Sequence, residues 1–285
     1  MIFTAQRSWI RAGTTALATL AAGLSVTGCE SGGSSGPAAG PTTGTALRVP
    51  ISPPRAYSTD ALLFAGTGTW SDEVAVLEQL LLAKRATYSK VSSAALDAMS
   101  VDDLAKFGVM IFPGGSGGAE AAGLSVDTHA RLRQAVQQRG VNYVGFCAGS
   151  FIAVAPAPAP DHDVSYGLGV AAGPELQYYY LENQGTDIAM TLQTFADGTR
   201  ADILWYGGPV TPDLPGGVIA RYPDGKPAIS EQWAGQGFVV LSGGHPAANS
   251  AMLASLGMQS TDGTHPDLAW KLISAALHQQ PWPAF

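Results

Sequence analysis

Charged side chains are scarce in this chain of 285 residues, since Asp, Glu, Lys and Arg together make up only 13% of it. That is about half the usual share. The 15 basic residues form no cluster and the net charge is −7, so a polybasic surface for nucleic acid or for anionic lipid is not expected. The 35 glycines and the 46% of hydrophobic residues favour a compact fold over a solvated or disordered chain.

Long hydrophobic runs are also lacking. Two arginines near the N-terminus precede an apolar run at 12–24, which is shorter than the roughly 20 residues of a permanent membrane span. Val-Thr-Gly-Cys at 26–29 follows and resembles the bacterial lipobox, whose cysteine is lipidated. An ordinary secretory peptide with an incidental cysteine is the alternative. We predict a lipoprotein signal peptide at 1–29 and a lipid membrane as partner through Cys29, which places the protein in the cell envelope.

Cysteine occurs only twice. Residues 30–46 are mostly Ser, Gly, Pro, Ala and Thr, which predicts a disordered linker before a folded domain at 47–285. If Cys29 is lipidated, Cys147 has no partner for an intramolecular disulfide, and a solitary thiol in an exported protein is a candidate reactive group. No residue spacing supports a metal site, even around His162 between its two aspartates, so neither metal nor cofactor is expected.

The hydrophobic pattern predicts alternating strands and helices, with Ser71 at the N-cap of the first helix. Four strands are expected at 61–65, 86–91, 109–112 and 141–146, with helices after Ser71 and at 101–107 and 128–139. Six further strands are expected at 178–181, 188–192, 203–206, 218–222, 228–233 and 238–241, before a helix at 268–277. We predict an α/β fold: a parallel, doubly wound, flavodoxin-like sheet with helices on both faces and a β-rich C-terminal part. Ligands bind such sheets beyond the carboxyl ends of the strands.

The strand at 141–146 runs directly into Cys147 and then into an apolar helical segment, which predicts a tight strand-to-helix turn. Gly145 and Gly149 stand two residues away on each side, where a larger side chain would collide with the turn. Lowering a thiol pKa from ~8.5 to below 7 takes roughly 2 kcal/mol, whereas a helix N-terminus supplies only ~0.3–1 kcal/mol. A reactive Cys147 therefore needs a histidine partner; otherwise it is a small buried hydrophobic residue.

Two of the five histidines are candidates for that partner. His265 is followed by Pro266 just before the last helix, with Thr264 as a candidate N-cap, so a helix start explains it fully. His245 instead follows a strand end and two glycines, which suits a base that faces a crevice. We therefore prefer His245. His129 and His278 lie in predicted helices and are interpreted as surface or capping residues.

Three motifs in order carry a resemblance to a known family. They are Ile-Phe-Pro-Gly-Gly at 111–115, Gly-Phe-Cys-Ala-Gly-Ser at 145–150 and Gly-Gly-His-Pro at 243–246. Together they resemble the class I glutamine amidotransferase-like fold, from residue 61 to the C-terminal helix. Trp-Tyr-Gly-Gly-Pro at 205–209 and Tyr-Pro-Asp-Gly at 222–225 resemble the branch named for the N-terminal domain of biotin-protein ligases.

The resemblance implies a nucleophilic cysteine site. Cys147 would attack an amide or ester carbonyl, and His245 would take its proton and return it to the leaving group. The backbone amides of Gly115 and Ala148 would bind the oxyanion, each contributing ~2.7–4 kcal/mol. The resemblance also implies a crevice lined by three further residues, Gly114, Gly117 and Ser150.

One departure from the family pattern puts catalysis in doubt. The family has an acid after His-Pro, but Ala247 stands there in this chain. Losing the acid that orients the histidine can cost ~10⁴ in rate. Glu231, Asn249 and Asp267 are unranked candidates for its role. The chain also lacks a partner synthetase domain and a nucleotide-binding segment, so it is not itself a biotin ligase.

Three functions follow as hypotheses. The first is an amide or acyl hydrolase of an unknown small-molecule or cell-envelope substrate. The second is a binding module that recognises a ligand in the same crevice without turnover. The third is a redox sensor based on reversible oxidation of Cys147.

Overall fold

The structure is a computed structural model that describes residues 55–154, 167–171, 173, 176–179 and 187–285. The predicted signal peptide with Cys29, the linker at 30–46 and His162 lie outside the described residues. Within the described ranges, no helix is both long enough and apolar enough to cross a membrane.

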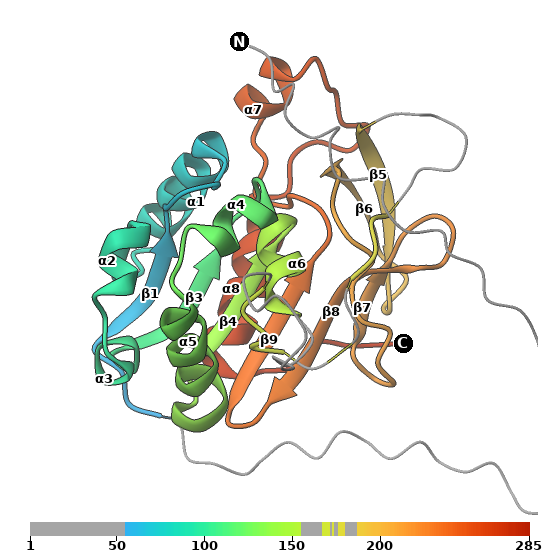
Figure 1. Ribbon diagram of the computed structural model, residues 1–285. Helices are drawn as coiled ribbons and strands as arrows, with labels where there is room; N and C mark the ends of the chain where they lie inside the picture. The colour runs from blue at the N-terminus through green and yellow to red at the C-terminus, as the bar shows by residue number, and fades with distance from the viewer. Residues whose placement is uncertain (1–54, 155–166, 172, 174–175, 180–186) are drawn as a thin grey trace, which may run out of the picture. The chain divides into compact units, whose positions relative to one another are not determined.

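The described part of the chain forms a nine-stranded mixed sheet of order β2-β1-β3-β4-β9-β8-β7-β5-β6 (Figure 1). Its parallel part consists of β1 (Thr59–Phe64), β2 (Tyr88–Val91), β3 (Phe107–Phe112), β4 (Asn142–Phe146) and β9 (Gly237–Ser242). Its antiparallel part adds β5 (Ile188–Phe195), β6 (Arg200–Tyr206), β7 (Val218–Arg221) and β8 (Pro227–Ala234). The β-rich C-terminal part therefore extends the same sheet and does not form a separate one. Its strands can follow one another closely in the sequence, because short turns are enough to join antiparallel strands.

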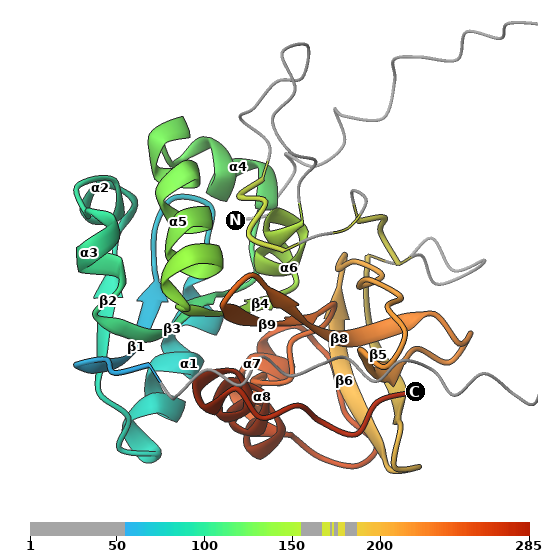
Figure 2. The same ribbon diagram turned by 90° about the horizontal axis from the view of Figure 1, so that it is seen from below.

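Helices cover both faces of the parallel strands (Figure 2). The helices are α1 (Ser71–Ala83), α2 (Ser93–Asp97), α3 (Val101–Leu104), α4 (Gly117–Ala122), α5 (Val126–Arg139), α6 (Ala148–Ala153), α7 (Ser250–Ser255) and α8 (Pro266–His278). Alternate residues of a strand point to opposite faces. In β1, Leu62 and Phe64 join an apolar cluster with residues of α5 and α6, whereas Ala61 and Leu63 join a second cluster with residues of α1 and α8.

Helix boundaries show where local sequence signals were insufficient. Trp70 and not Ser71 is the N-cap of α1, and it makes no side-chain capping hydrogen bond. His265 and not Thr264 is the N-cap of α8. The short helices α2, α4 and α7 were not predicted, because each is only five or six residues long and carries little periodicity. His129, interpreted as a surface or capping residue, is buried, and its Nε2 lies 3.0 Å from the carbonyl oxygen of Ala121.

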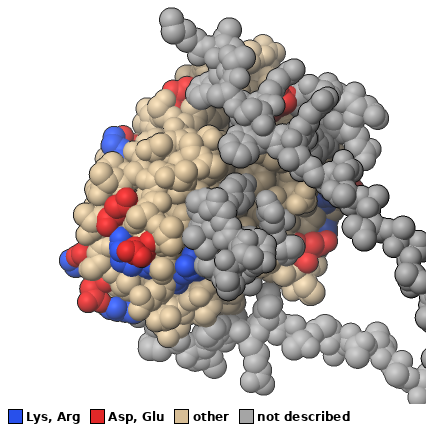
Figure 3. All heavy atoms as spheres, in the orientation of Figure 1, with Lys and Arg blue, Asp and Glu red and all other residues tan. Residues whose placement is uncertain are grey.

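Charged side chains of both signs lie side by side on the face shown in Figure 3. Exposed ion pairs of the described residues include Arg139 with Asp102, and Lys106 with Asp103. Such exposed pairs typically contribute about 0–1 kcal/mol each. The apolar clusters on the two sides of the sheet therefore stabilise the fold far more than these pairs do.

The turn between β4 and α6 is closely packed against β3. A Cβ atom on Gly145 would lie 2.6 Å from the carbonyl carbon of Gly149, and one on Gly149 would lie 2.1 Å from the carbonyl oxygen of Phe112. The hydroxyl of Tyr143 donates a hydrogen bond of 2.7 Å to the carbonyl oxygen of Gly149. Both glycines are therefore required by backbone contacts that cannot move aside.

We expect Gly149→Ala to lower the free energy of unfolding by about 2 kcal/mol or more, because the new methyl group overlaps the backbone of β3. Gly118→Ala is the matched control, since a Cβ there meets nothing within 4 Å. That control should be neutral or stabilising by up to about 1 kcal/mol. Urea unfolding of both variants measures the difference, and a Gly149→Ala protein as stable as wild type would contradict the packing described.

Candidate active site

Cys147 lies in the turn that the sequence predicts and has an unusual backbone conformation. Its φ of 46° and ψ of −104° fall in a region that residues other than glycine rarely adopt. Its backbone amide donates a 2.8 Å hydrogen bond to Ser242 at the end of β9, which helps to fix this conformation. Strain of this kind persists where the surrounding structure enforces it, and it is concentrated at functional sites.

His245 lies in the loop after β9 and is also held by the backbone. Its amide donates a 2.8 Å hydrogen bond to the carbonyl oxygen of Leu204 in β6, so this edge strand of the sheet contacts the site. Its imidazole is buried against Gly114, where a Cβ would lie only 2.4 Å from Cε1. The indole of Trp70 packs edge-on against the imidazole, with 5.3 Å between ring centroids.

The acid that the His-Pro motif lacks comes from the first helix. Nδ1 of His245 lies 2.9 Å from Oε1 of Glu73, in the first turn of α1. The other carboxylate oxygen of Glu73 accepts a hydrogen bond from the amide of Gly114. Glu73 is fully buried, so this carboxylate is both desolvated and doubly bonded. Cys147, His245 and Glu73 thus have the components of a nucleophile, a base and an orienting acid.

The three candidates proposed from the sequence for this acid have other partners. Glu231 accepts a 3.0 Å hydrogen bond from the backbone amide of Trp282. Asn249 is the N-cap of α7, and Asp267 forms an ion pair with Lys84. In the structure, the acid that lies beside His245 is instead Glu73. The rejected histidine, His265, lies 2.8 Å from Asp262.

The position of Glu73 in the sequence does not reveal its contact with His245. Glu73 stands with Asp72 in the first turn of α1, where acidic residues favour the helix dipole, and this local explanation was sufficient from the sequence. Yet α1 begins just beyond the carboxyl end of β1, at the same edge of the parallel sheet as Gly114 and Cys147. That shared edge is the signal that could have identified Glu73.

The surroundings of His245 favour its charged form. Burial lowers the pKa of His245, but the charges of Glu73 and Cys147 and hydrogen bonding to both outweigh burial and raise the pKa to about 10. Nδ1 faces Glu73, so the buried Nε2 is the ring nitrogen that interacts with Cys147. That arrangement is the one that proton exchange with the thiol requires.

The two amides expected to bind an oxyanion are available. Neither Gly115 nor Ala148 donates its backbone N–H to another described residue. Sγ of Cys147 lies 3.4 Å from the carbonyl oxygen of Tyr206, to which the thiol form can donate. Backbone amides that have no acceptor in the protein are the kind of donor that can stabilise a tetrahedral intermediate.

The expected crevice residues differ in their surroundings. Gly114 packs on the Glu73–His245 pair, and Gly117 lies at the start of α4, where a Cβ would lie 3.5 Å from Ile152 of α6. Ser150 is fully buried, and its hydroxyl bonds to the carbonyl oxygens of Gly145 and Ser242, both at 2.8 Å. The structure therefore gives Ser150 a role in holding the turn together.

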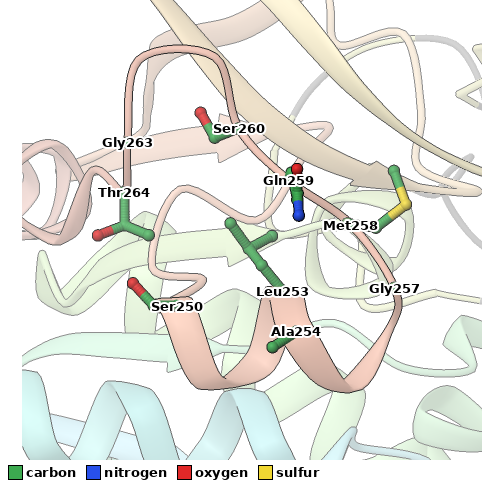
Figure 4. Close-up of a pocket in the computed structure, with 9 residues that line it drawn as sticks. All are labelled: Ser250, Leu253, Ala254, Gly257, Met258, Gln259, Ser260, Gly263 and Thr264. Carbon is green, nitrogen blue, oxygen red and sulfur yellow. The ribbon is translucent and has the colours of Figure 1, made fainter.

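A surface pocket lies apart from this site. It is formed by α7 and the chain that follows it, with Leu253, Met258 and Thr264 among its lining residues (Figure 4). Neither Cys147 nor His245 lines this pocket. Among the described residues, no group of three or more His, Cys, Asp or Glu side chains is placed to hold a metal ion.

Comparison with solved structures identifies the class of fold. A crystal structure of a glutamine amidotransferase matches with a TM-score of 0.52 and 18% identity, over 76% of this chain and 98% of the other. A ThuA-like protein from Parabacteroides merdae matches at a TM-score of 0.43 and 12% identity, over 78% of this chain and 89% of the other. Comparison with protein-family models and with curated protein sequences gives no match. The chain thus has a glutamine amidotransferase-like fold; at these identities the likeness concerns the fold alone.

The charge on His245 should make stability depend on pH. Its pKa is about 10 in the folded protein and 6.5 when unperturbed. The protonated imidazole therefore stabilises the fold fully below about pH 6.5, and that stabilisation is lost as the pH rises towards 10. Relative to His245→Gln, the wild-type free energy of unfolding should fall by about 1 kcal/mol per pH unit across this interval.

Denaturant unfolding at several pH values measures this slope. His265→Gln is the control, because its imidazole is partly exposed beside Asp262 and its curve should run parallel to that of the wild type. A wild-type curve parallel to that of His245→Gln would show that His245 is not a buried cation.

Proposed function

We propose that the protein is a cysteine-dependent amide or acyl hydrolase with Cys147 as nucleophile, His245 as general base and acid, and Glu73 as the residue that orients His245. The observation that carries the proposal is the 2.9 Å contact between Glu73 and Nδ1 of His245, which leaves the buried Nε2 to interact with Cys147. The binding-module hypothesis drew on the missing acid at Ala247, and Glu73 removes that reason.

The proposed reaction has two steps. The thiol proton moves to Nε2 of His245, and the thiolate forms a bond to the substrate carbonyl carbon while the oxyanion binds to the amides of Gly115 and Ala148. The tetrahedral intermediate collapses as His245 protonates the leaving group, which gives an acyl-thioester on Cys147. Water, deprotonated by His245, then hydrolyses the thioester and regenerates the thiol.

We also propose a doubly wound sheet, membership of the biotin-protein ligase N-terminal branch, and a membrane anchor. The five adjacent parallel strands and the apolar clusters on both of their faces support a doubly wound arrangement. The sequence motifs at 205–209 and 222–225 support the biotin-protein ligase N-terminal branch of the fold class. The substrate is a small molecule or cell-envelope material, because the lipobox at 26–29 supports anchoring of the domain to a membrane through Cys29.

Glu73→Gln should lower the rate of Cys147 acylation by about 10²–10⁴, because glutamine neither stabilises the imidazolium nor selects its productive tautomer. The full chain with Cys29→Ser, which leaves Cys147 as its one cysteine, is treated with a p-nitrophenyl ester, and the acyl adduct is followed by intact-mass spectrometry. Asp267→Asn is the matched control and should match its parent.

The outcomes separate the hypotheses. Acylation that requires Cys147, His245 and Glu73 supports the hydrolase. A Cys147 that is not acylated, together with oxidation to a sulfenic acid at low peroxide, would favour the redox sensor instead. Equal acylation rates in Glu73→Gln and Asp267→Asn would remove Glu73 from the mechanism.

Lipidation can be tested separately in a bacterial host. An alkyne-labelled fatty acid should be incorporated into the wild-type protein and into Cys147→Ser, but not into Cys29→Ser. Label in the Cys29→Ser protein would contradict the anchor.

A further inference from the structure

A second buried acid lies beside the proposed site and has no role in the mechanism above. Glu120 is in α4, directly after the Gly115 loop, and its side chain is 0% exposed. Neither of its carboxyl oxygens has a hydrogen-bond partner among the described residues. Oε1 lies so near the Gly115 backbone that a Cβ there would be 2.9 Å from it.

The groups around Glu120 offer it no compensating positive charge. Cys147 and Glu73 both act on it electrostatically, and Tyr143 of β4 in turn feels its charge. From α5, the buried His129 contacts α4 through the Ala121 carbonyl oxygen. No ion pair of Glu120 with a lysine, arginine or histidine occurs among the described residues.

An ionised carboxylate has an unfavourable free energy in such surroundings. A buried charge without a partner is strongly disfavoured, and a buried carboxyl group takes up a proton instead. Burial, followed by the negative charges of Cys147 and Glu73, holds the pKa of Glu120 well above its usual range.

We propose that Glu120 is a positioning residue of Cys147: it stays a neutral carboxylic acid behind the Gly115 loop, and the proton it keeps is what allows Cys147 to become a thiolate. The inference rests on the proposed function, since it concerns the reactive state of the same cysteine. The site then holds two anions, Cys147 and Glu73, against one cation, His245. An ionised Glu120 would add a third anion to this buried group of residues.

The step is balanced without a further reactant. The proton leaves Sγ of Cys147 for Nε2 of His245, and Glu120 neither gives nor takes a proton while this happens. Coupling between two sites is reciprocal. The negative charge of Cys147 therefore adds to the effect of burial on Glu120, and removal of that charge should let the proton leave Glu120 at lower pH.

Infrared spectroscopy of the full chain with Cys29→Ser tests the proposal directly. At neutral pH the carbonyl stretching band of protonated carboxylic acids should lose intensity in Glu120→Gln. Glu231 accounts for the intensity that remains, because burial raises its pKa to about 7. Glu78→Gln is the matched control, because Glu78 bonds to Lys90 and Tyr88 at the surface and its loss should leave the band unchanged. Alkylation of Cys147 with iodoacetamide should lower the pH midpoint of the band by about one unit.

Two results would overturn the proposal. The first is that Glu120 contributes no protonated band at neutral pH. The second is that the pH midpoint of its band does not change when Cys147 is alkylated, which is the behaviour of an acid with a purely structural role. The ratio of the Cys147 alkylation rate in Glu120→Gln to that in its parent should also rise with pH, since only the parent gains a charge. Failure of the hydrolase proposal is distinguishable, because the band and its response to alkylation do not require acylation of Cys147.

Discussion

The contact between Glu73 and His245 is the interaction on which the rest of the candidate site depends. It joins residues that are 172 positions apart, and it holds the imidazole between the first helix and the loop after the last strand. The same carboxylate binds the amide of Gly114, which precedes the amide expected to bind the oxyanion. One buried acid therefore fixes the orientation of the base and the position of the Gly114 loop together.

The site requires both halves of the sheet. The parallel strands bring the loops after β1, β3 and β4 to one edge, as expected for ligand sites in α/β folds. The antiparallel half contributes through β6, whose Leu204 binds the amide of His245 and whose Tyr206 carbonyl oxygen lies beside Cys147. The mixed sheet thus places one backbone acceptor beside the thiol and another on the backbone amide of His245.

What the sequence predicts well is local. Gly145 and Gly149 predict the turn at Cys147 because their effect operates within a few residues, and most strands were placed within two or three residues of their observed ends. Glu73 and Glu120 were missed for a different reason. Each has a complete local explanation in the first turn of a helix, and their roles emerge only from the packing of α1 and α4 on distant segments. When the acid of a triad is far from its histidine in the sequence, no residue spacing indicates that the two are partners.

The position of β9 affects the order in which the protein can fold during its synthesis. β9 lies in the middle of the sheet, between β4 and β8, although it is the last strand to be synthesised. Until residues beyond 237 have emerged from the ribosome, β4 lacks this neighbour and Cys147 has neither the Ser242 carbonyl oxygen nor His245 beside it. Late, non-local pairing of this kind is slow to form. Cys147 therefore acquires the surroundings of the candidate site only when the fold is complete.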